Sequence, residues 1–178
     1  VNTIAGRVDA NAMEGWWYEG AGIYRHTWLV KRPATHIATD GVFAQPVRGA
    51  GGGWTVPVEV TVAHAGTAAA RAAVEVVLLD PAGRPVAKRR ATAKVEPLDQ
   101  AVVRLTIPVK SPRLWSVDKP VLYRVQTRLL GRGQGVDEVI TRCGFRTFRF
   151  DAKRGFFLNG RALKIKGVCH HQDPAGVG

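Results

Sequence analysis

A run of chemically versatile side chains lies near the end of the sequence, where residues 169–173 read Cys-His-His-Gln-Asp. The residues before it, 163–168, are predicted to form a strand. A polar cluster at the end of a strand is typical of one edge of an active site, and these side chains are also metal ligands. Adjacent residues of a strand point to opposite faces and cannot together close a tetrahedron around one ion. The pattern therefore favours an edge of an active site over a metal centre.

A second candidate segment is aromatic and rich in glycine, since residues 14–22 read Glu-Gly-Trp-Trp-Tyr-Glu-Gly-Ala-Gly. Glycine lets the backbone approach a ligand or another domain closely, and such loops often carry function. Residues 4–9 form a short strand-like run, residues 23–30 alternate between apolar and polar side chains, and both are predicted to be strands. The segment is therefore expected to be a loop between two strands, with a role in binding or packing.

The central part of the sequence must form the scaffold that positions these segments. Its valines at positions 56, 58, 60 and 62 alternate with other residues, which places one face of a strand in a core. Asp-Pro-Ala-Gly at 80–83 predicts a turn, because proline presets φ at the first central position. About seven strands follow one another in roughly 110 residues, with turns every 8 to 12 positions and no helical period. We therefore predict an all-β fold, an immunoglobulin-like antiparallel β-sandwich.

A different unit is expected after residue 143. Residues 144–150 carry aromatic side chains at every second or third position. Asn159-Gly160 then separates two apolar runs, and Asn-Gly in this setting is a strong signal for a two-residue turn. A β-hairpin is therefore predicted around residues 156–163.

The composition excludes several classes of protein. Of the 178 residues, 46% are hydrophobic and 22% charged, so a disordered or collagen-like chain is excluded. The chain is too short for a complete (β/α)8 barrel, which needs roughly 250 residues. No apolar run approaches the roughly 18 residues of a membrane span, and the first residues have no features of a targeting segment. Cys143 and Cys169 are a single pair without the Cys-x-x-Cys spacing of a metal site, and the sequence does not decide whether they form a disulfide.

The net charge of +12 raises the question of a polyanionic partner. The basic residues are spread along the predicted strands, as at Arg71, Arg104 and Arg142, and form no block with interleaved aromatic residues. A solvated basic surface is therefore the favoured interpretation. The alternative is a stand-alone basic β-sandwich module that binds acidic polysaccharide or nucleic acid, with binding that weakens steeply as salt rises.

Several motifs, in consistent order, resemble those of glycoside hydrolase family 2, the family of β-galactosidases, β-glucuronidases and β-mannosidases. Residues 14–25 end in Gly-Ile-Tyr-Arg, which is similar to the end of the family's sugar-binding jelly roll. Pro-Arg-Leu-Trp at 112–115, with Pro-Val-Leu-Tyr at 120–123, resembles the signature of the central immunoglobulin-like domain. Trp115 and Tyr123 in this signature are expected in the core or at a corner of the sandwich. The motifs that resemble the passage into the catalytic barrel are residues 144–146, 157–160 and 166–173.

The resemblance implies an internal piece of a longer protein. Residues 1–34 would be the C-terminal remnant of the jelly roll, 35–143 the whole sandwich, and 144–178 the lead-in and first strand of a truncated TIM barrel. In this family, hydrolysis of the O-glycosidic bond is retaining and uses two glutamates about 5 Å apart on later barrel strands. The acid directly follows an asparagine, and the 178 residues contain no Asn-Glu pair. The chain alone is therefore expected to be an inactive, non-catalytic scaffold, and a complete small enzyme is not favoured.

The resemblance also assigns roles to the candidate site residues. His171 matches the family position whose imidazole contacts the sugar, a task in which one ring nitrogen donates to a hydroxyl while a neighbour holds the other. Asp173 and His170 are candidates for a second hydroxyl contact or for orienting the imidazole. The alternative for both is that they only brace the loop, and this alternative is favoured for His170. Trp17 and Tyr18 are expected to pack between jelly roll and barrel, with stacking on the sugar as the alternative.

The motifs are most similar to the β-galactosidase branch, which implies a role in carbohydrate metabolism and a carbohydrate substrate for the full-length parent. Within that parent the sandwich is expected to pack on the jelly-roll and barrel domains. No cofactor, metal, nucleic acid or membrane partner is expected. A periplasmic or secreted location is favoured over a cytoplasmic one.

Overall fold

The computed structural model describes residues 3–9, 22–23, 26–131 and 134–169, which belong to two units. The smaller unit combines residues 1–31 with 167–178, and its described residues form no strand or helix. The strands predicted at 4–9 and 23–30 are therefore wrong for the residues described there. A strand requires a partner for its backbone hydrogen bonds, and these segments have none within the described part of their unit. No helix in the described ranges is long and apolar enough to cross a membrane.

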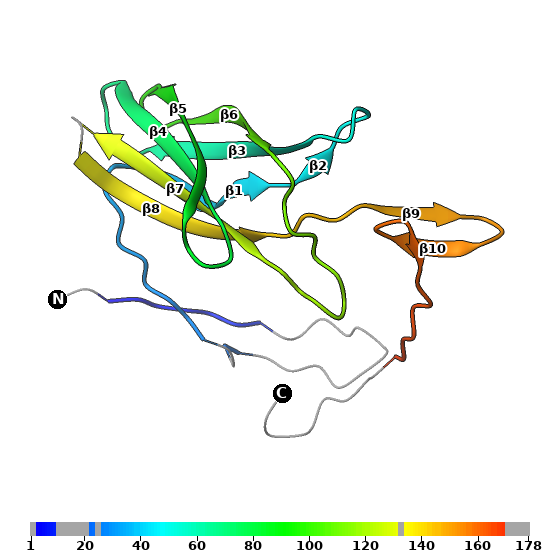
Figure 1. The fold of residues 1–178 in the computed structure, drawn as a ribbon. Helices are drawn as coiled ribbons and strands as arrows, with labels where there is room; N and C mark the ends of the chain where they lie inside the picture. Colours follow the sequence, from blue (N-terminus) through cyan, green and yellow to red (C-terminus); the bar gives the residue numbers. More distant parts are fainter. Residues whose placement is uncertain (1–2, 10–21, 24–25, 132–133, 170–178) are drawn as a thin grey trace. The chain divides into compact units, whose positions relative to one another are not determined.

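The larger unit spans residues 32–166 and holds the strands (Figure 1). In β3 every second side chain from Trp54 to Val62 is buried and those between are partly exposed, as a pleated strand at a core requires. The strands are β1 (Thr35–Ala44), β2 (Val47–Arg48), β3 (Trp54–His64), β4 (Ala70–Leu79), β5 (Pro85–Val95), β6 (Gln100–Val109), β7 (Tyr123–Gly131), β8 (Gln134–Cys143), β9 (Phe148–Asp151), β10 (Gly155–Leu158) and β11 (Arg161–Ala162).

Two antiparallel sheets form a sandwich from β1 to β8 (Figure 1). In the first sheet β1 and β2 pair along one edge of β3, and β6 pairs along the other. The second sheet has the order β5-β4-β7-β8. The chain changes sheet after β3, β5 and β6, which is the connectivity of an immunoglobulin-like fold. The predicted all-β, immunoglobulin-like sandwich is confirmed.

The core between the sheets is built mainly from valine. The four alternating valines of β3, at 56, 58, 60 and 62, are at most 1% exposed. The fully buried side chains that join them from the second sheet are Val74, Val76, Leu78, Val125 and Leu129. Branched side chains of this kind fill a sandwich core without polar atoms, and in β3 the valine pattern specifies which face of the strand turns inward.

One polar side chain, that of Thr127 in β7, lies fully buried in this core. It is 0% exposed, and its hydroxyl oxygen has no hydrogen-bond partner among the described residues. An unsatisfied buried hydroxyl costs about 1–3 kcal/mol, and valine has nearly the same shape. We therefore expect Thr127→Val to raise the free energy of unfolding by about 1 kcal/mol in urea denaturation. Thr106→Val, at an exposed position, is the control and should change the free energy of unfolding by less than about 0.5 kcal/mol. A loss of stability in Thr127→Val would contradict the prediction.

After β8 the chain leaves the sandwich and forms a small sheet of order β11-β10-β9 (Figure 1). Asn159 and Gly160 connect β10 to β11 with φ angles of +50° and +80°. Two successive positive φ angles are what a type I′ turn requires, so the predicted Asn-Gly hairpin is confirmed. The predicted strand at 163–168 is wrong, because residues 163–169 form no strand. Its first N–H, that of Leu163, still donates to the Phe156 carbonyl at 2.9 Å, and the described pairing ends there.

Candidate functional site

The site residues predicted from the sequence are His170, His171, Asp173, Trp17 and Tyr18, and all five lie outside the described residues. Their roles therefore stay predictions. Within the described ranges, no group of three His, Cys, Asp or Glu side chains is placed to hold a metal ion.

The two cysteines are free thiols. Cys143, the last residue of β8, is buried, and this burial raises the pKa of its thiol to about 11. A thiol with such a pKa stays protonated at neutral pH and is a poor nucleophile. Cys143 is therefore a core residue, whereas Cys169 is exposed.

The structure does bring three segments together where the sandwich passes into β9. We call this place the junction: the loop 112–116 before β7, the linker 144–147 after β8, and the turn 159–160 between β10 and β11. Leu114 and Phe145 form a parallel β-bridge, and the Trp115 N–H donates to the Phe145 carbonyl at 2.8 Å. The linker is thus held to the loop by backbone pairing as well as by side chains.

Phe145 anchors the linker in the core. Its side chain is 0% exposed and meets two other aromatic rings edge to face, that of Trp54 at 5.4 Å and that of Tyr123 at 4.8 Å between centroids. This geometry is favourable because the positive edge of one ring faces the negative face of another. The chain therefore leaves the sandwich from a rigid point.

Tyr123 begins β7 and fixes the loop in front of it. Its ring is 5% exposed, and its hydroxyl oxygen accepts a hydrogen bond from the Arg113 backbone N–H at 3.0 Å. A buried tyrosine at the start of this strand that bonds to upstream backbone is the tyrosine corner of immunoglobulin-like sandwiches. The corner role predicted for Tyr123 is confirmed. Trp115 is instead only half-buried, at the edge of the core.

Trp115 packs over the linker at a glycine. An added Cβ at Gly144 would lie 3.1 Å from the Cβ of Trp115 and 3.2 Å from its Cγ, so a larger residue would push the ring away. The guanidinium of Arg146 lies over the same indole, 4.8 Å from the ring centroid. Cys143 and Phe145 alternate with these two residues and face the core, as the pleat of an extended chain dictates. Gly144 is therefore required for close packing of the loop on the linker.

Asn159 closes the junction with its side-chain amide. Its Nδ2 donates to the Trp115 carbonyl at 2.9 Å, and its Oδ1 accepts from the Thr147 N–H at 3.0 Å. Its own backbone N–H donates to the Thr147 carbonyl at 2.8 Å. The turn between β10 and β11 is thus bonded to both other segments of the junction.

The outward face of the second sheet shows how the positive charge is distributed. Glu75 of β4 has a side chain only 5% exposed, and its Oε2 lies 2.6 Å from both Lys88 Nζ and Arg90 Nη2 of β5. The hydrogen bond from Lys88 is the largest cause that lowers the pKa of Glu75. Arg128 of β7 stands opposite Glu75 and pairs with Glu138 of β8 at 2.7 Å. Each of these three cations is therefore paired with one of the two carboxylates, and the row keeps a net charge of +1. Pairing of the cations with carboxylates of the chain itself makes them less available to a polyanion.

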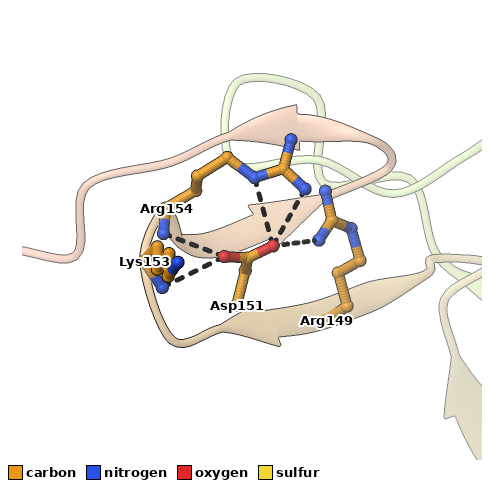
Figure 2. A network of polar contacts seen from close by, with 4 residues as sticks. All are labelled: Arg149, Asp151, Lys153 and Arg154. Carbon is orange, nitrogen blue, oxygen red and sulfur yellow. Dashed lines mark hydrogen bonds and ion pairs between the residues drawn. The ribbon is translucent and has the colours of Figure 1, made fainter.

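A second charge network closes the turn between β9 and β10. Figure 2 shows the carboxylate of Asp151 between Arg149 and Arg154. Its Oδ1 accepts from the backbone N–H groups of Lys153 and Arg154 at 3.1 and 3.0 Å, and its Oδ2 lies 2.9 Å from Arg154 Nη2. These hydrogen bonds, that of the Arg154 side chain first, lower the pKa of Asp151 from 3.8 to about 2.

The network predicts a shift of the acid titration of this turn. Because the folded pKa of Asp151 is below its usual value, the network's contribution is fully present above pH 3.8 and is lost as the pH falls toward about 2. The amide resonances of Lys153 and Arg154 should therefore titrate with a midpoint near 2 in NMR spectra. Asp151→Asn should abolish this titration; a midpoint near 3.8 in the unmodified chain would show that the network does not form.

Sequence reasoning missed the side-chain role of Asn159. The Asn-Gly signal predicted only a turn, for which the positive φ of the first residue suffices. Its amide bonds to residues 12 and 44 positions earlier in the chain, and no local pattern reports partners at that distance. A preference for asparagine over aspartate or glycine at this position would have been the signal to look for.

Comparison with known proteins identifies the sandwich. The sequence model described as glycosyl hydrolases family 2 matches residues 35–146, which begin with β1 and end in the junction. The chain is 34% identical over 178 residues, 99% of its length, to a β-galactosidase of Bacteroides ovatus, and it spans 21% of that protein.

Solved structures agree with this match. A crystal structure of a glycosyl hydrolase family 2 member from Bacteroides cellulosilyticus has a TM-score of 0.81 and 32% identity over 93% of this chain and 23% of its own. A β-glucuronidase of Bacteroides uniformis has a TM-score of 0.75 and 28% identity over 83% of this chain and 18% of its own. The chain thus spans about a fifth of the length of the relatives that it matches. It belongs to glycosyl hydrolases family 2.

Proposed function

We propose that this chain is the non-catalytic scaffold part of a retaining exo-glycosidase of the β-galactosidase branch. The observation that carries the proposal is the family match over residues 35–146, which coincides with the immunoglobulin-like sandwich. The absence of an Asn-Glu pair from the 178 residues supports a scaffold role for the chain by itself. We divide the chain into a jelly-roll remnant at 1–34, the sandwich at 35–143 and the start of a barrel at 144–178.

In this proposal the bond is cleaved by two carboxyl groups that later parts of the parent supply. One protonates the leaving oxygen, and the other attacks the anomeric carbon to form a glycosyl-enzyme intermediate that water then hydrolyses. This chain contributes the platform and one wall of the sugar pocket. His171 donates a hydrogen bond to a sugar hydroxyl, while Asp173 makes a second hydroxyl contact or orients that imidazole.

A β-galactoside is the proposed substrate. The β-galactosidase of Bacteroides ovatus supports it, with 34% identity over 99% of the chain. A β-glucuronide is the competing choice, supported by the β-glucuronidase structure from Bacteroides uniformis. A glucuronide differs by its carboxylate, which needs a cation placed opposite it. The two substrates are therefore separable by assay.

The test has two steps. The first is to sequence the coding region beyond residue 178, where we expect several hundred further codons with an Asn-Glu pair and a later glutamate. The second is to assay the 178-residue chain and the full-length protein with 4-nitrophenyl β-galactoside and β-glucuronide. We expect turnover of the galactoside by the full-length protein alone. Turnover by the 178-residue chain would overturn the scaffold role, and a stop codon after residue 178 with salt-sensitive binding to heparin would favour the polyanion-binding alternative.

A further inference from the structure

The side chain of Asn159 does more than its turn requires. In a type I′ turn the first central residue must accept a positive φ, which glycine, asparagine and aspartate all do. Asn159 has a φ of +50° and is half-buried, with its amide turned toward the loop before β7 and the linker after β8. The identity of this residue therefore has a second physical reason.

The amide uses its donor and its acceptor at the same time. Nδ2 donates to the Trp115 carbonyl at 2.9 Å while Oδ1 accepts from the Thr147 N–H at 3.0 Å. Aspartate has the acceptor but no donor, and glycine has neither. Only an amide of this length satisfies both backbone groups without changing the turn.

Of the two side-chain bonds, the one to the Trp115 carbonyl joins the hairpin to the sandwich, because Thr147 directly precedes β9 and lies on the hairpin side. Phe145 is already anchored in the core, and only residues 146 and 147 separate it from β9. The bond to Trp115 therefore restrains rotation at the φ and ψ angles of these two residues. Trp115, which receives one bond, is itself bonded through its N–H to the Phe145 carbonyl at 2.8 Å. The bonds therefore run from the turn at 159–160 to the buried ring of Phe145.

We propose that Asn159 is a positioning residue whose amide locks the hairpin of β9, β10 and β11 to the sandwich and fixes the direction in which the chain leaves at residues 161–166. This inference rests on the proposed function, because that direction matters for catalysis only if a sugar pocket follows. A displacement of about 1 Å at a reacting centre can lower the rate a hundredfold. The direction of the segment at residues 161–166 is therefore expected to affect the rate of catalysis.

The lock itself is tested on the 178-residue chain by NMR. Asn159→Gly keeps the turn and removes both side-chain bonds, Asn159→Asp keeps only the acceptor, and Lys153→Ala changes the other turn of the same hairpin as a control. In Asn159→Gly we expect the backbone amide hydrogen of Thr147 to exchange with solvent about tenfold faster. We also expect the residual dipolar couplings of β9 and β10 to become smaller than those of the sandwich, because the hairpin then changes its orientation relative to the sandwich. Asn159→Asp should retain the Thr147 protection, and Lys153→Ala should match the unmodified chain. Unchanged couplings in Asn159→Gly would overturn the lock.

The positioning role is tested on the full-length protein with the same variants. We expect Asn159→Gly to lower kcat about tenfold while KM changes less than twofold and Tm less than about 2 °C. A merely structural role would lower Tm and leave kcat of the folded enzyme unchanged, and that result would overturn the positioning role. If the unmodified full-length protein hydrolyses no glycoside, the proposed function fails, whereas the NMR result on the lock still stands by itself.

Discussion

Replacement of Phe145 by alanine should lower the free energy of unfolding of the sandwich by about 4 kcal/mol. The side chain is fully buried, and its removal leaves a cavity that the rings of Trp54 and Tyr123 line on two sides. The loss combines the transfer of a phenyl ring to water, the cavity, and two edge-to-face contacts. The total free energy of unfolding of a native domain is about 5–15 kcal/mol, so the change removes a large part of the stability of the sandwich.

Urea denaturation followed by circular dichroism measures this loss. Phe150→Ala in β9 is the matched control, because that ring is 73% exposed and its removal should cost less than about 0.5 kcal/mol. The free energy of unfolding of Phe145→Leu should lie between those of Phe145→Ala and Phe150→Ala. This variant keeps the test decisive if Phe145→Ala does not fold. Equal stability of the three variants would mean that Phe145 does not anchor the linker in the core.

The sandwich was predictable because its signals are local. The valines of β3 alternate with the period of a strand, and each buried position follows from the residue two places away. The same is true of the turns at 80–83 and 159–160, whose residue types set the backbone angles directly. The fold class and these turns therefore need no knowledge of distant contacts, whereas the strand order depends on pairings such as that of β4 with β7 and was not predicted.

The junction was not predictable, because it depends on pairs far apart in the chain. Asn159 and Trp115 are 44 positions apart, and Leu114 pairs with Phe145 across the whole length of β7 and β8. The failed strand predictions at 4–9 and 23–30 have the same origin, since alternation shows that a segment suits a sheet but not that a partner strand is present. The predicted site residues lie in segments that the structure does not describe, so they remain sequence predictions.

Removal of both cations beside Glu75 should be the second large effect. The side chain of Glu75 is 5% exposed, and in Lys88→Met/Arg90→Met it loses both of its ion pairs at 2.6 Å while the methionine side chains are expected to keep covering it. Arg128 stands opposite it but is held by Glu138 at 2.7 Å. A buried charge without a partner costs about 3 kcal/mol, and we expect that loss in the free energy of unfolding at pH 7. Arg104→Met removes an exposed ion pair with Glu59 and, as the control, should cost less than about 1 kcal/mol.

The contribution of Glu75 to the free energy of unfolding should depend on pH with opposite signs in Lys88→Met/Arg90→Met and in the unmodified chain. In the unmodified chain the cations hold the pKa of Glu75 below its usual 4.5, so its contribution is present above pH 4.5 and is lost as the pH falls through the folded pKa. Without them, burial is the remaining cause and raises the pKa of Glu75, so protonation now relieves the cost and stability recovers as the pH falls. Urea midpoints at pH 7 and pH 5 measure the difference. A further change of Glu75 to methionine should restore stability at pH 7, because it removes the unpaired charge itself. If this triple variant is as unstable as the double variant, packing and not charge causes the loss.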